Sequence, residues 1–212
     1  MNWKANLTAK NMYDLQGQSE PKGIKRTLSF FGAVGGVLYF LIEVLVVALA
    51  LAVVVYLFLL SPHEVIGHSM DPNFANGEYL IANKVIYKTK LPNRGDVIIF
   101  KHSETEDYIK RVIGLPGDTV AIQDGKLVLN GNVLDESEYL KSSVYTNGDD
   151  YLKEGQSITV PDGKIFVCGD NRPNSSDSRN FGPISLDLLK GKAWLVYYPF
   201  SDLRLVEHAK YQ

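Results

Sequence analysis

The apolar positions of the chain follow two different patterns, and the first is a long continuous run. From residue 27 to residue 60 the only charged residue is Glu43. Residues 40–60 alone make up 21 positions, close to the ~20 that a helix needs to cross a hydrocarbon core of ~30 Å. A cleavable signal sequence has a shorter apolar region, of ~7 to 15 residues, near the start of the chain. Because this run is longer and follows a polar tail of 26 residues, it predicts a retained membrane helix.

After residue 60 the pattern changes to short apolar runs separated by clusters of Gly, Pro, Asn and Asp. Such runs predict strands, and Asp124-Gly125 between two of them predicts a hairpin. Their density predicts a mainly β fold, an antiparallel sandwich or barrel-like domain. Little helix is expected beyond a turn or two in residues 184–189, and residues 135–151 are expected to form a surface loop. The expected strands are residues 79–82, 96–100, 108–113, 119–122, 126–129, 157–160, 164–167 and 193–198.

Basic residues are distributed unevenly around the apolar run. Five precede it, whereas the first lysine or arginine after it is Lys84. Because the cytoplasmic flanks of membrane helices carry the excess of lysine and arginine, the N-terminus is expected in the cytoplasm. The sequence therefore predicts a cytoplasmic tail (residues 1–26), a membrane anchor segment (27–62, with a core span of about 40–60) and an extracytoplasmic domain (63–212).

The predicted outer domain is acidic and has a single cysteine. The tail and the apolar run hold 5 of the 22 basic and 3 of the 24 acidic residues, which leaves 17 basic and 21 acidic residues outside and a net charge of −4. A negative domain argues against nucleic acid as a partner. Cys168 is the only cysteine, so no intramolecular disulfide can form. The four histidines are scattered without metal-ligand spacing, and neither a metal nor another cofactor is expected.

Ser69 lies in a turn-like segment, residues 66–72. Most serines are structural, but this one has Gly67 before it and Pro72 after it, which permit a sharp bend and the close approach of another backbone. It also follows the end of the apolar run by only nine residues. Ser69 is therefore a candidate nucleophile at the membrane face.

Lys110 lies within the expected strand of residues 108–113. Strand alternation puts Tyr108, Lys110 and Val112 on one face, so Lys110 is expected to be flanked by apolar side chains. Burial disfavours the ammonium and lowers its pKa from ~10.4 toward neutrality, as a general base requires. Arg111 cannot serve because it stays protonated. A serine and a neutral lysine are the minimum parts of a serine peptidase without a catalytic histidine.

A third segment, residues 169–182, is dense in short hydrogen-bonding side chains. Its composition alone is typical of a polar surface loop. The same side chains could also orient a neutral lysine amine, and Asp177 could pair with Arg179. Composition favours the first interpretation, so this segment is only suggestive by itself.

These segments together resemble the bacterial type I signal peptidases, the Ser-Lys enzymes that release secreted proteins from their membrane-bound signal peptides. The matching pieces occur in the order of that family and cover most of the chain from the apolar run to Gly182. They are Gly67-His68-Ser69-Met70-Asp71-Pro72, residues 94–100, residues 108–118, and residues 169–171 with Ser175, Asp177, Ser178, Arg179 and Gly182.

The resemblance implies a role for each matching residue. Ser69 would be the nucleophile and Lys110 its general base. Ser175 would hydrogen-bond the lysine, and Asp177 and Arg179 would form a supporting ion pair. The cleft that accepts small side chains before the scissile bond would be lined by Val65, Ile66, Met70, Tyr108 and Ile109.

Two positions depart from the pattern of that family. Gly67 stands where some members carry a serine hydroxyl as a second oxyanion donor, so the only donor assigned is the Ser69 N–H. Asn73 follows Pro72 where the family usually has threonine, and it keeps the capacity to hydrogen-bond. Lys110, rather than histidine, indicates the bacterial type and not that of the endoplasmic reticulum.

The resemblance also implies partners and a location. The partners would be the signal peptides of secretory preproteins and the lipid bilayer, with a secretion translocon as a further one, and the anchor would cross the plasma membrane once. A self-cleaving repressor-type Ser-Lys peptidase is one alternative, but it should carry a DNA-binding helix-turn-helix and be soluble. A catalytically inactive single-pass scaffold is the other, which the intact Ser69, Lys110 and Ser175 disfavour.

Overall fold

The computed structural model describes residues 22–211, of which residues 22–33, 57 and 58 by their backbone alone. Most of the predicted cytoplasmic tail, residues 1–21, therefore lies outside the described residues. Contacts between residues divide the chain into two compact units, Met1–Val53 and Val54–Gln212.

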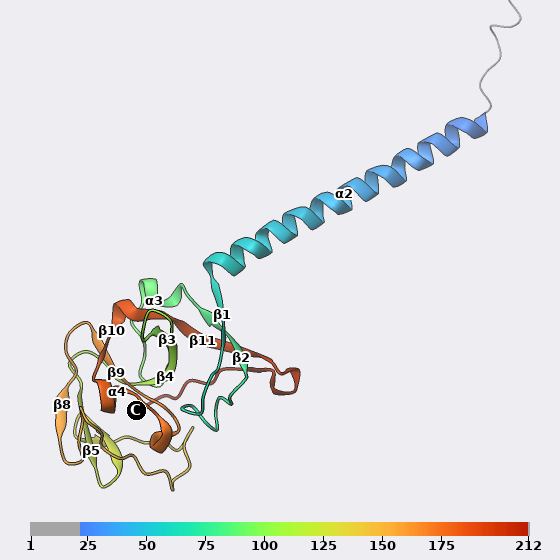
Figure 1. Ribbon diagram of the computed structural model, residues 1–212. Coiled ribbons are helices and arrows are strands. Elements are labelled where there is room, and N and C mark those ends of the chain that lie inside the picture. The colour runs from blue at the N-terminus through green and yellow to red at the C-terminus, as the bar shows by residue number, and fades with distance from the viewer. Residues whose placement is uncertain (1–21, 212) are drawn as a thin grey trace, which may run out of the picture. The chain divides into compact units, whose positions relative to one another are not determined.

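The apolar run forms one uninterrupted helix, α2 (Lys22–Phe58) (Figure 1). Its segment Val34–Tyr56 has 23 residues with a mean hydropathy of 2.9 and is long and apolar enough to cross a membrane. At 1.5 Å per residue such a segment extends ~35 Å, more than the ~30 Å of a hydrocarbon core. Residues 60–62, which the prediction included in the anchor segment, belong to a strand instead.

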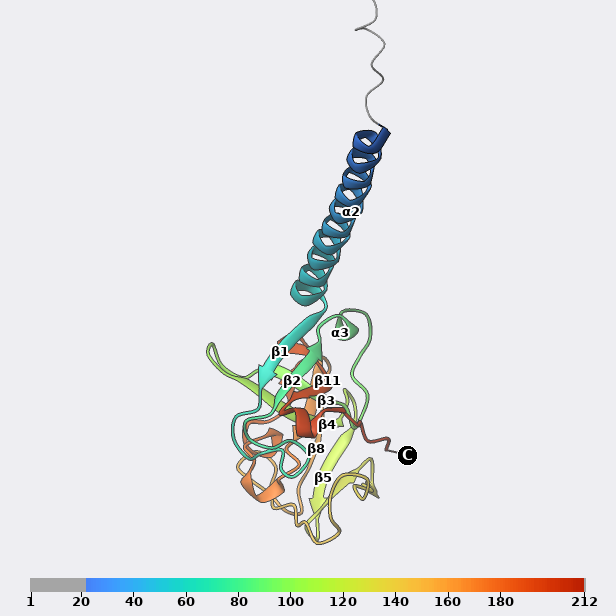
Figure 2. The ribbon, with the colours of Figure 1, turned by 90° about the vertical axis from the view of Figure 1, so that its right-hand side faces the viewer.

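Most strands of the second unit belong to a twisted antiparallel sheet, drawn in Figures 1 and 2. They are β1 (Leu60–Glu64), β2 (Tyr79–Asn83), β3 (Val97–Lys101), β4 (Asp107–Gly114), β9 (Lys164–Cys168), β10 (Ile184–Ser185), β11 (Leu189–Tyr198) and β12 (Arg204–Leu205). Their order is β1-β2-β11-β3-β4-β9-β10, and β12 pairs with β11. The sequence missed β1 because Leu-Ser-Pro-His-Glu has no apolar alternation, whereas backbone pairing with β2 makes it a strand.

A second, 4-stranded sheet has the order β7-β6-β5-β8. Its strands are β5 (Thr119–Gln123), β6 (Lys126–Leu129), β7 (Asn132–Val133) and β8 (Ser157–Thr159). The predicted hairpin joins β5 to β6, and φ is positive at both Asp124 and Gly125, as a two-residue type I′ turn requires. All pairs in both sheets are antiparallel, so the predicted mainly β fold is confirmed.

Helices in the second unit are short, as the sequence predicts. They are α3 (Ile86–Thr89), α4 (Ser178–Phe181) and the single turns η2 (Arg172–Asn174), η3 (Leu186–Leu188) and η4 (Phe200–Asp202). The helix expected in residues 184–189 is reduced to η3, because Ile184 pairs with Ile165 in the sheet and is buried there. Residues 135–151, between β7 and β8, hold neither a helix nor a strand.

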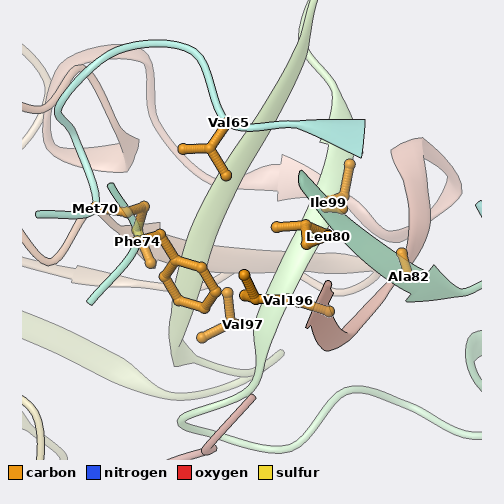
Figure 3. Close-up of a cluster of buried hydrophobic side chains, with 9 residues drawn as sticks. Val65, Met70, Phe74, Leu80, Ala82, Val97, Ile99 and Val196 are labelled. Carbon is orange, nitrogen blue, oxygen red and sulfur yellow. The ribbon is translucent and has the colours of Figure 1, made fainter. Parts of the chain in front are cut away.

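The turn that carries Ser69 is held in place by core side chains on both sides (Figure 3). Val65 before it and Met70 after it are 4% and 1% exposed, and both belong to the cluster that contains Leu80 and Ile99. Burying a side chain of this size contributes about 1.5–3 kcal/mol. The position of the turn is therefore set by packing as well as by its glycine and proline.

Candidate active site

The fold brings Ser69 and Lys110 into contact although they lie far apart in the sequence. Lys110 Nζ donates hydrogen bonds to Ser69 Oγ at 2.8 Å and to the Ile109 carbonyl oxygen at 3.0 Å. Lys110 lies in β4, directly opposite Ile98 of β3, and Ser69 lies in the segment between β1 and β2. A hydroxyl within hydrogen-bond reach of an amine is the arrangement that activates a serine nucleophile.

The surroundings of Lys110 favour the neutral amine. Its side chain is 3% exposed, and Nζ lies 4.9 Å from the centre of the Tyr108 ring. Burial lowers the pKa of Lys110 from 10.5 to about 8, although the charges of Asp177 and Asp170 act in the opposite direction. The burial that strand alternation predicted is confirmed. Near pH 8 such a group can both accept and return a proton.

A cleft with a volume of about 330 Å³ lies beside the Ser69 hydroxyl. Four of the five residues predicted to line it do so: Val65, Ile66, Tyr108 and Ile109. Met70 does not, because its side chain points into the core cluster, where it packs with Val65 and is 1% exposed (Figure 3).

Sequence reasoning missed two apolar residues that also line the cleft, Leu80 and Ile99. In the sheet Leu80 is paired with His63 and Ile99 with Ile109, so both come from strands next to those that border the cleft. Their period-two positions were visible in the sequence. The order of the strands, which brings them to the cleft, was not.

The strands on either side of the cleft have unpaired backbone edges. Within the described residues β1 is the end strand of its sheet and pairs only with β2. On β4, pairing with β9 begins at Arg111, so residues 107–110 pair with β3 alone. An extended peptide can form main-chain hydrogen bonds with such edges.

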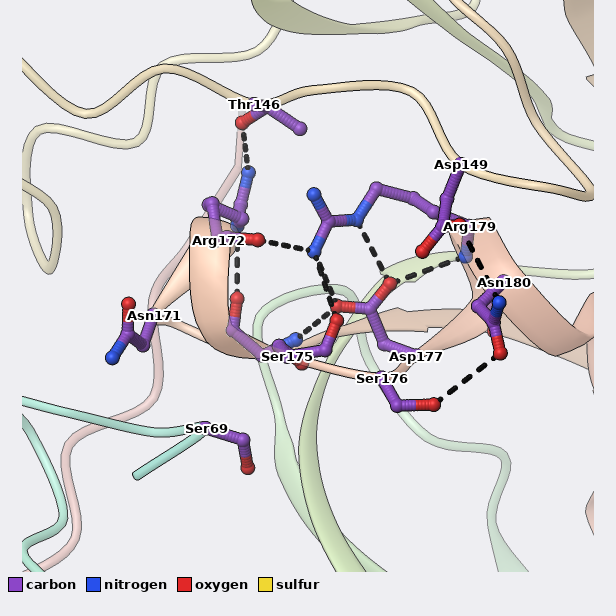
Figure 4. A network of polar contacts seen from close by, with 12 residues as sticks. Ser69, Thr146, Asp149, Asn171, Arg172, Ser175, Ser176, Asp177, Arg179 and Asn180 are labelled. Atoms are coloured by element: carbon purple, nitrogen blue, oxygen red, sulfur yellow. Dashed lines mark hydrogen bonds and ion pairs between the residues drawn. The ribbon is translucent and has the colours of Figure 1, made fainter. Parts of the chain in front are cut away.

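The polar loop after β9 holds the Ser69 turn from the other side (Figure 4). The Asn171 N–H donates to the Ser69 carbonyl oxygen at 3.0 Å, and Asn171 Nδ2 donates to the His68 carbonyl oxygen at 2.9 Å. A Cβ atom at Gly169 would lie 2.4 Å from the Ser69 carbonyl oxygen and 2.2 Å from Ser175 Oγ. Only glycine at position 169 therefore permits this approach of the two segments.

The predicted pair of Asp177 and Arg179 is formed within this loop (Figure 4). Arg179 Nε and Nη2 donate to the two carboxylate oxygens of Asp177 at 2.9 and 2.8 Å, and both side chains are buried. Burial alone would raise the pKa of Asp177, but the hydrogen bonds and charge of Arg179 and the Gly169 N–H outweigh it and lower that pKa. The ionised carboxylate also accepts from the Gly169 N–H at 2.9 Å, which ties Asp177 to the point of close approach.

Ser175 lies in the same loop, but the structure does not contain its implied hydrogen bond with Lys110. The Ser175 hydroxyl is buried and forms no hydrogen bond of ordinary geometry within residues 22–211, although it lies close enough to the Asp177 carboxylate to help lower its pKa. Lys110 Nζ donates to Ser69 and Ile109 instead. A buried hydroxyl without a partner costs about 1–3 kcal/mol. Ser175 is therefore free to bond a group that changes position or enters the site.

The backbone N–H groups around Ser69 are unequal as oxyanion donors. The Gly67 N–H donates to Asn76 Oδ1 at 2.8 Å and is therefore occupied. The Ser69 N–H, in contrast, forms no hydrogen bond with any other described residue. The Ser69 amide is therefore available as a donor beside the nucleophile.

Two ion pairs near the site, one fully buried and one partly buried, had no signal in the sequence. Arg111 Nε and Nη2 donate to the Asp170 carboxylate at 2.8 and 2.7 Å, with side chains 2% and 0% exposed. Arg172 is paired with Glu136 in the same region. Asn73 Nδ2 donates to Asp170 Oδ2 at 2.8 Å, so the residue that replaces the usual threonine keeps a hydrogen-bonding role.

Known proteins similar to this chain agree on one family. A family model described as signal peptidase, peptidase S26, matches residues 38–198. Signal peptidase I P of Bacillus subtilis subsp. natto is 40% identical over 166 residues, which are 76% of this chain and 89% of the relative. Signal peptidase IB of Staphylococcus aureus (strain COL) is 37% identical over 169 residues, 74% of this chain and 88% of the relative.

A crystal structure of a signal peptidase I from Enterococcus faecalis V583 is also similar, at 34% identity and a TM-score of 0.40, and covers 49% of this chain and 97% of that one. The family assignment depends on the family model, which matches more than half of the chain, and on the curated relatives. The chain therefore belongs to the signal peptidase I family, peptidase S26, whose members are serine peptidases that cleave signal peptides from preproteins.

Proposed function

We propose that this chain cleaves signal peptides with Ser69 as the nucleophile and Lys110 as the general base, while α2 anchors it in the plasma membrane. One observation carries the proposal. The Ser69 hydroxyl lies 2.8 Å from the amine of a lysine that is 3% exposed and whose pKa burial lowers to about 8. Such a lysine can take the place of the histidine in a Ser-His pair.

In the first half of the reaction, neutral Lys110 takes the proton of the Ser69 hydroxyl as Oγ attacks the scissile carbonyl carbon. The oxyanion that forms accepts a hydrogen bond from the Ser69 N–H, a contribution whose loss typically lowers the rate by ~10²- to 10³-fold. The carbon–nitrogen bond then breaks. Protonated Lys110 gives its proton to the amine of the departing mature protein, and the signal peptide stays bound to Ser69 as an ester.

In the second half, Lys110 takes a proton from a water molecule that attacks this ester. The bond between Ser69 Oγ and the acyl carbon breaks, and Lys110 returns the proton to Ser69 Oγ. The signal peptide leaves with a new carboxylate. Ser175 would bond the Lys110 amine during these transfers, because its buried hydroxyl has no other partner among the described residues. Asp177 and Arg179 would hold the loop in position.

The substrate would bind as an extended strand between the open edges of β1 and β4. Residues 107–110 and the end of β1 offer backbone groups that pair with no other strand on that side within the described part of the chain. Val65, Ile66, Tyr108 and Ile109 would contact the side chains before the scissile bond. By resemblance to the signal peptidases, these side chains would be small.

The proposed topology has residues 1–26 in the cytoplasm, the apolar part of α2 across the plasma membrane and the catalytic domain, residues 63–212, outside. The excess of basic residues before the apolar run supports this orientation. A secretion translocon would deliver preproteins to the same face of the membrane.

We expect the full chain to resist alkaline carbonate extraction from membranes, because an apolar segment of 23 residues can span the bilayer. Protease added outside spheroplasts should digest a C-terminal tag and leave an N-terminal tag intact until the cells are opened. A C-terminal tag that is protected in intact spheroplasts would contradict the orientation. Extraction of the chain by carbonate would contradict the anchor.

The pH dependence of cleavage should follow the protonation of Lys110. Only the neutral amine can accept the Ser69 proton, so kcat/KM should rise about tenfold per pH unit below pH 8 and level off above it. The measurement is kcat/KM between pH 6 and 10 for the full chain in vesicles, with a substrate that lacks ionisable groups near the scissile bond. A profile controlled by a group near pH 10.5, the ordinary lysine value, would contradict a buried base. Circular dichroism at each pH serves as the control for folding.

A further inference from the structure

A pocket separate from the catalytic cleft lies where the chain leaves α2. Its volume is about 480 Å³, and three lysines line it, Lys84, Lys88 and Lys190, together with Ser61, Tyr87 and two leucines. None of these lining residues is acidic. A concave surface with one sign of charge raises the local concentration of the opposite ion.

Two of the three lysines have no counter-ion in the described part of the chain. Lys190 Nζ is paired with the Asp107 carboxylate at 2.7 Å. Lys84 and Lys88 form no ion pair with any of residues 22–211. The pocket therefore has two uncompensated positive charges. The Tyr87 hydroxyl donates to Asp96 Oδ2 at 3.0 Å, so its polar end is already used.

A backbone hydrogen bond ties the pocket to the residue that follows the apolar helix. The Lys84 N–H donates to the carbonyl oxygen of Leu59, the first residue after α2, at 3.1 Å. The candidate span ends at Tyr56, five residues before Ser61. The polar headgroup layer of a bilayer is about 5–8 Å thick on each side. Provided that α2 spans the membrane as proposed above, the short stretch of chain from Tyr56 to Ser61 keeps Ser61 and Lys84 close to the headgroup layer.

We propose that this pocket binds the headgroup phosphate of an anionic phospholipid. The ammonium groups of Lys84 and Lys88 contact the phosphate oxygens, and the Ser61 hydroxyl is a further donor beside them. Leu186 and Leu189 add apolar surface that a lipid can contact and a free phosphate ion cannot. Basic clusters immediately beside a membrane helix attract anionic lipids, with about a fivefold gain for each lysine or arginine.

The test measures which lipid the full chain retains. The purified protein is supplied with equal amounts of phosphatidylglycerol and phosphatidylcholine in detergent micelles, and native mass spectrometry counts the bound lipids of each kind. We expect the wild type to retain phosphatidylglycerol in preference. The double variant Lys84→Gln/Lys88→Gln should lower the ratio of bound phosphatidylglycerol to phosphatidylcholine by at least about fivefold.

Lys153→Gln/Lys164→Gln is the matched control, because both lysines are exposed and form no ion pair with the other described residues. It removes the same charge elsewhere and should leave the ratio unchanged. Equal lowering of the ratio by both double variants, or no lowering by Lys84→Gln/Lys88→Gln, would overturn the lipid site. Release of the bound phosphatidylglycerol by millimolar inorganic phosphate would also overturn the lipid site, because it would show that the pocket binds a soluble anion equally well.

This inference depends on the proposed anchorage, and the two can fail separately. If carbonate extracts the full chain from membranes, the anchorage fails and the lipid site fails with it. If the chain stays in the membrane and cleaves preproteins but shows no preference for phosphatidylglycerol, only the lipid site fails. A thermal unfolding midpoint equal to that of the wild type would show that Lys84→Gln/Lys88→Gln has kept its fold.

Discussion

Replacement of Ser69 by alanine should lower kcat/KM for preprotein cleavage by about 10⁶-fold, the typical loss when a serine nucleophile is removed. Alanine removes the atom that attacks the scissile carbonyl but keeps the backbone amide that faces the oxyanion. Ser69 Oγ accepts one hydrogen bond, from the buried Lys110 amine, so its loss should lower the free energy of unfolding by about 1–3 kcal/mol and leave the protein folded. The measurements are cleavage of a full-length preprotein in vesicles and chemical unfolding of the same preparation.

Lys110→Met should lower kcat/KM about as much as Ser69→Ala does, but it should also raise the free energy of unfolding at pH 7. The pKa of Lys110 is 10.5 when exposed and about 8 in the folded protein. Below pH 8 the amine is charged in both states, and its burial destabilises the folded state because water hydrates this charge in the unfolded chain. The difference corresponds to about 3 kcal/mol. Because the unfolded chain binds more protons between pH 8 and 10.5, the wild type should regain this stability as pH rises through that window. The variant should lack that rise.

An exposed lysine provides the control for this pair of variants. Lys126→Met in β6 removes the same charge at a solvent-exposed position, so it should alter neither cleavage nor stability by a comparable amount. Cleavage at the wild-type rate by Ser69→Ala or by Lys110→Met would show that the dyad is assigned wrongly. A Lys110→Met variant less stable than the wild type at pH 7 would show that the amine is not buried with an unfavourable charge.

Arg111→Met should destabilise the fold by about 3–5 kcal/mol, because it leaves the Asp170 carboxylate buried without its partner. Asp170 is fully buried and accepts two hydrogen bonds from Arg111, at 2.8 and 2.7 Å. The next residue, Asn171, donates to the Ser69 carbonyl oxygen at 3.0 Å, so cleavage should fall as well. The double variant Arg111→Met/Asp170→Asn removes both charges and should recover part of the lost stability. Chemical unfolding of the full chain in micelles measures each step.

Arg94→Met is the matched control for the buried pair. Arg94 also makes a two-pronged contact with a carboxylate, that of Asp118, at 2.8 and 2.7 Å. Its side chain is 37% exposed, compared with 2% for Arg111, so solvent compensates for much of the loss. We expect a change of about 1 kcal/mol or less in the free energy of unfolding. If Arg94→Met and Arg111→Met destabilise equally, burial is not the source of the effect.

Local patterns in the sequence were sufficient for the long helix and for eight of the twelve strands of the described residues. The length and hydropathy of the apolar run predicted α2, and short apolar runs between turn residues predicted eight strands. Alternation within one of them predicted the burial of Lys110. These features depend on residues within a few positions of one another, because helix and strand periods act over that distance. β1 was missed for the same reason, since its pairing with β2 leaves no mark on its own five residues.

The composition of the site could be inferred from the sequence, but its contacts depended on the order of the strands. Alternation placed Lys110 on a buried face, and resemblance to a family named Ser69 as its partner. Their contact at 2.8 Å requires β4 and the segment after β1 to converge across the curled sheet. The same convergence explains the errors: Met70 packs into the core below the turn, while Ser175 approaches Gly169 without bonding the lysine.

The amino-acid pattern was enough to predict a membrane-spanning helix, a mainly β domain and a buried lysine, because hydrophobicity and alternation are local properties. The contacts between distant segments were decided by the pairing of strands in the tertiary structure. It joined Arg111 to Asp170 and left the edges of β1 and residues 107–110 open beside the nucleophile. It also gathered Lys84, Lys88 and Lys190 around one pocket. Contacts across such distances depend on packing of the whole sheet, which no short stretch of sequence specifies.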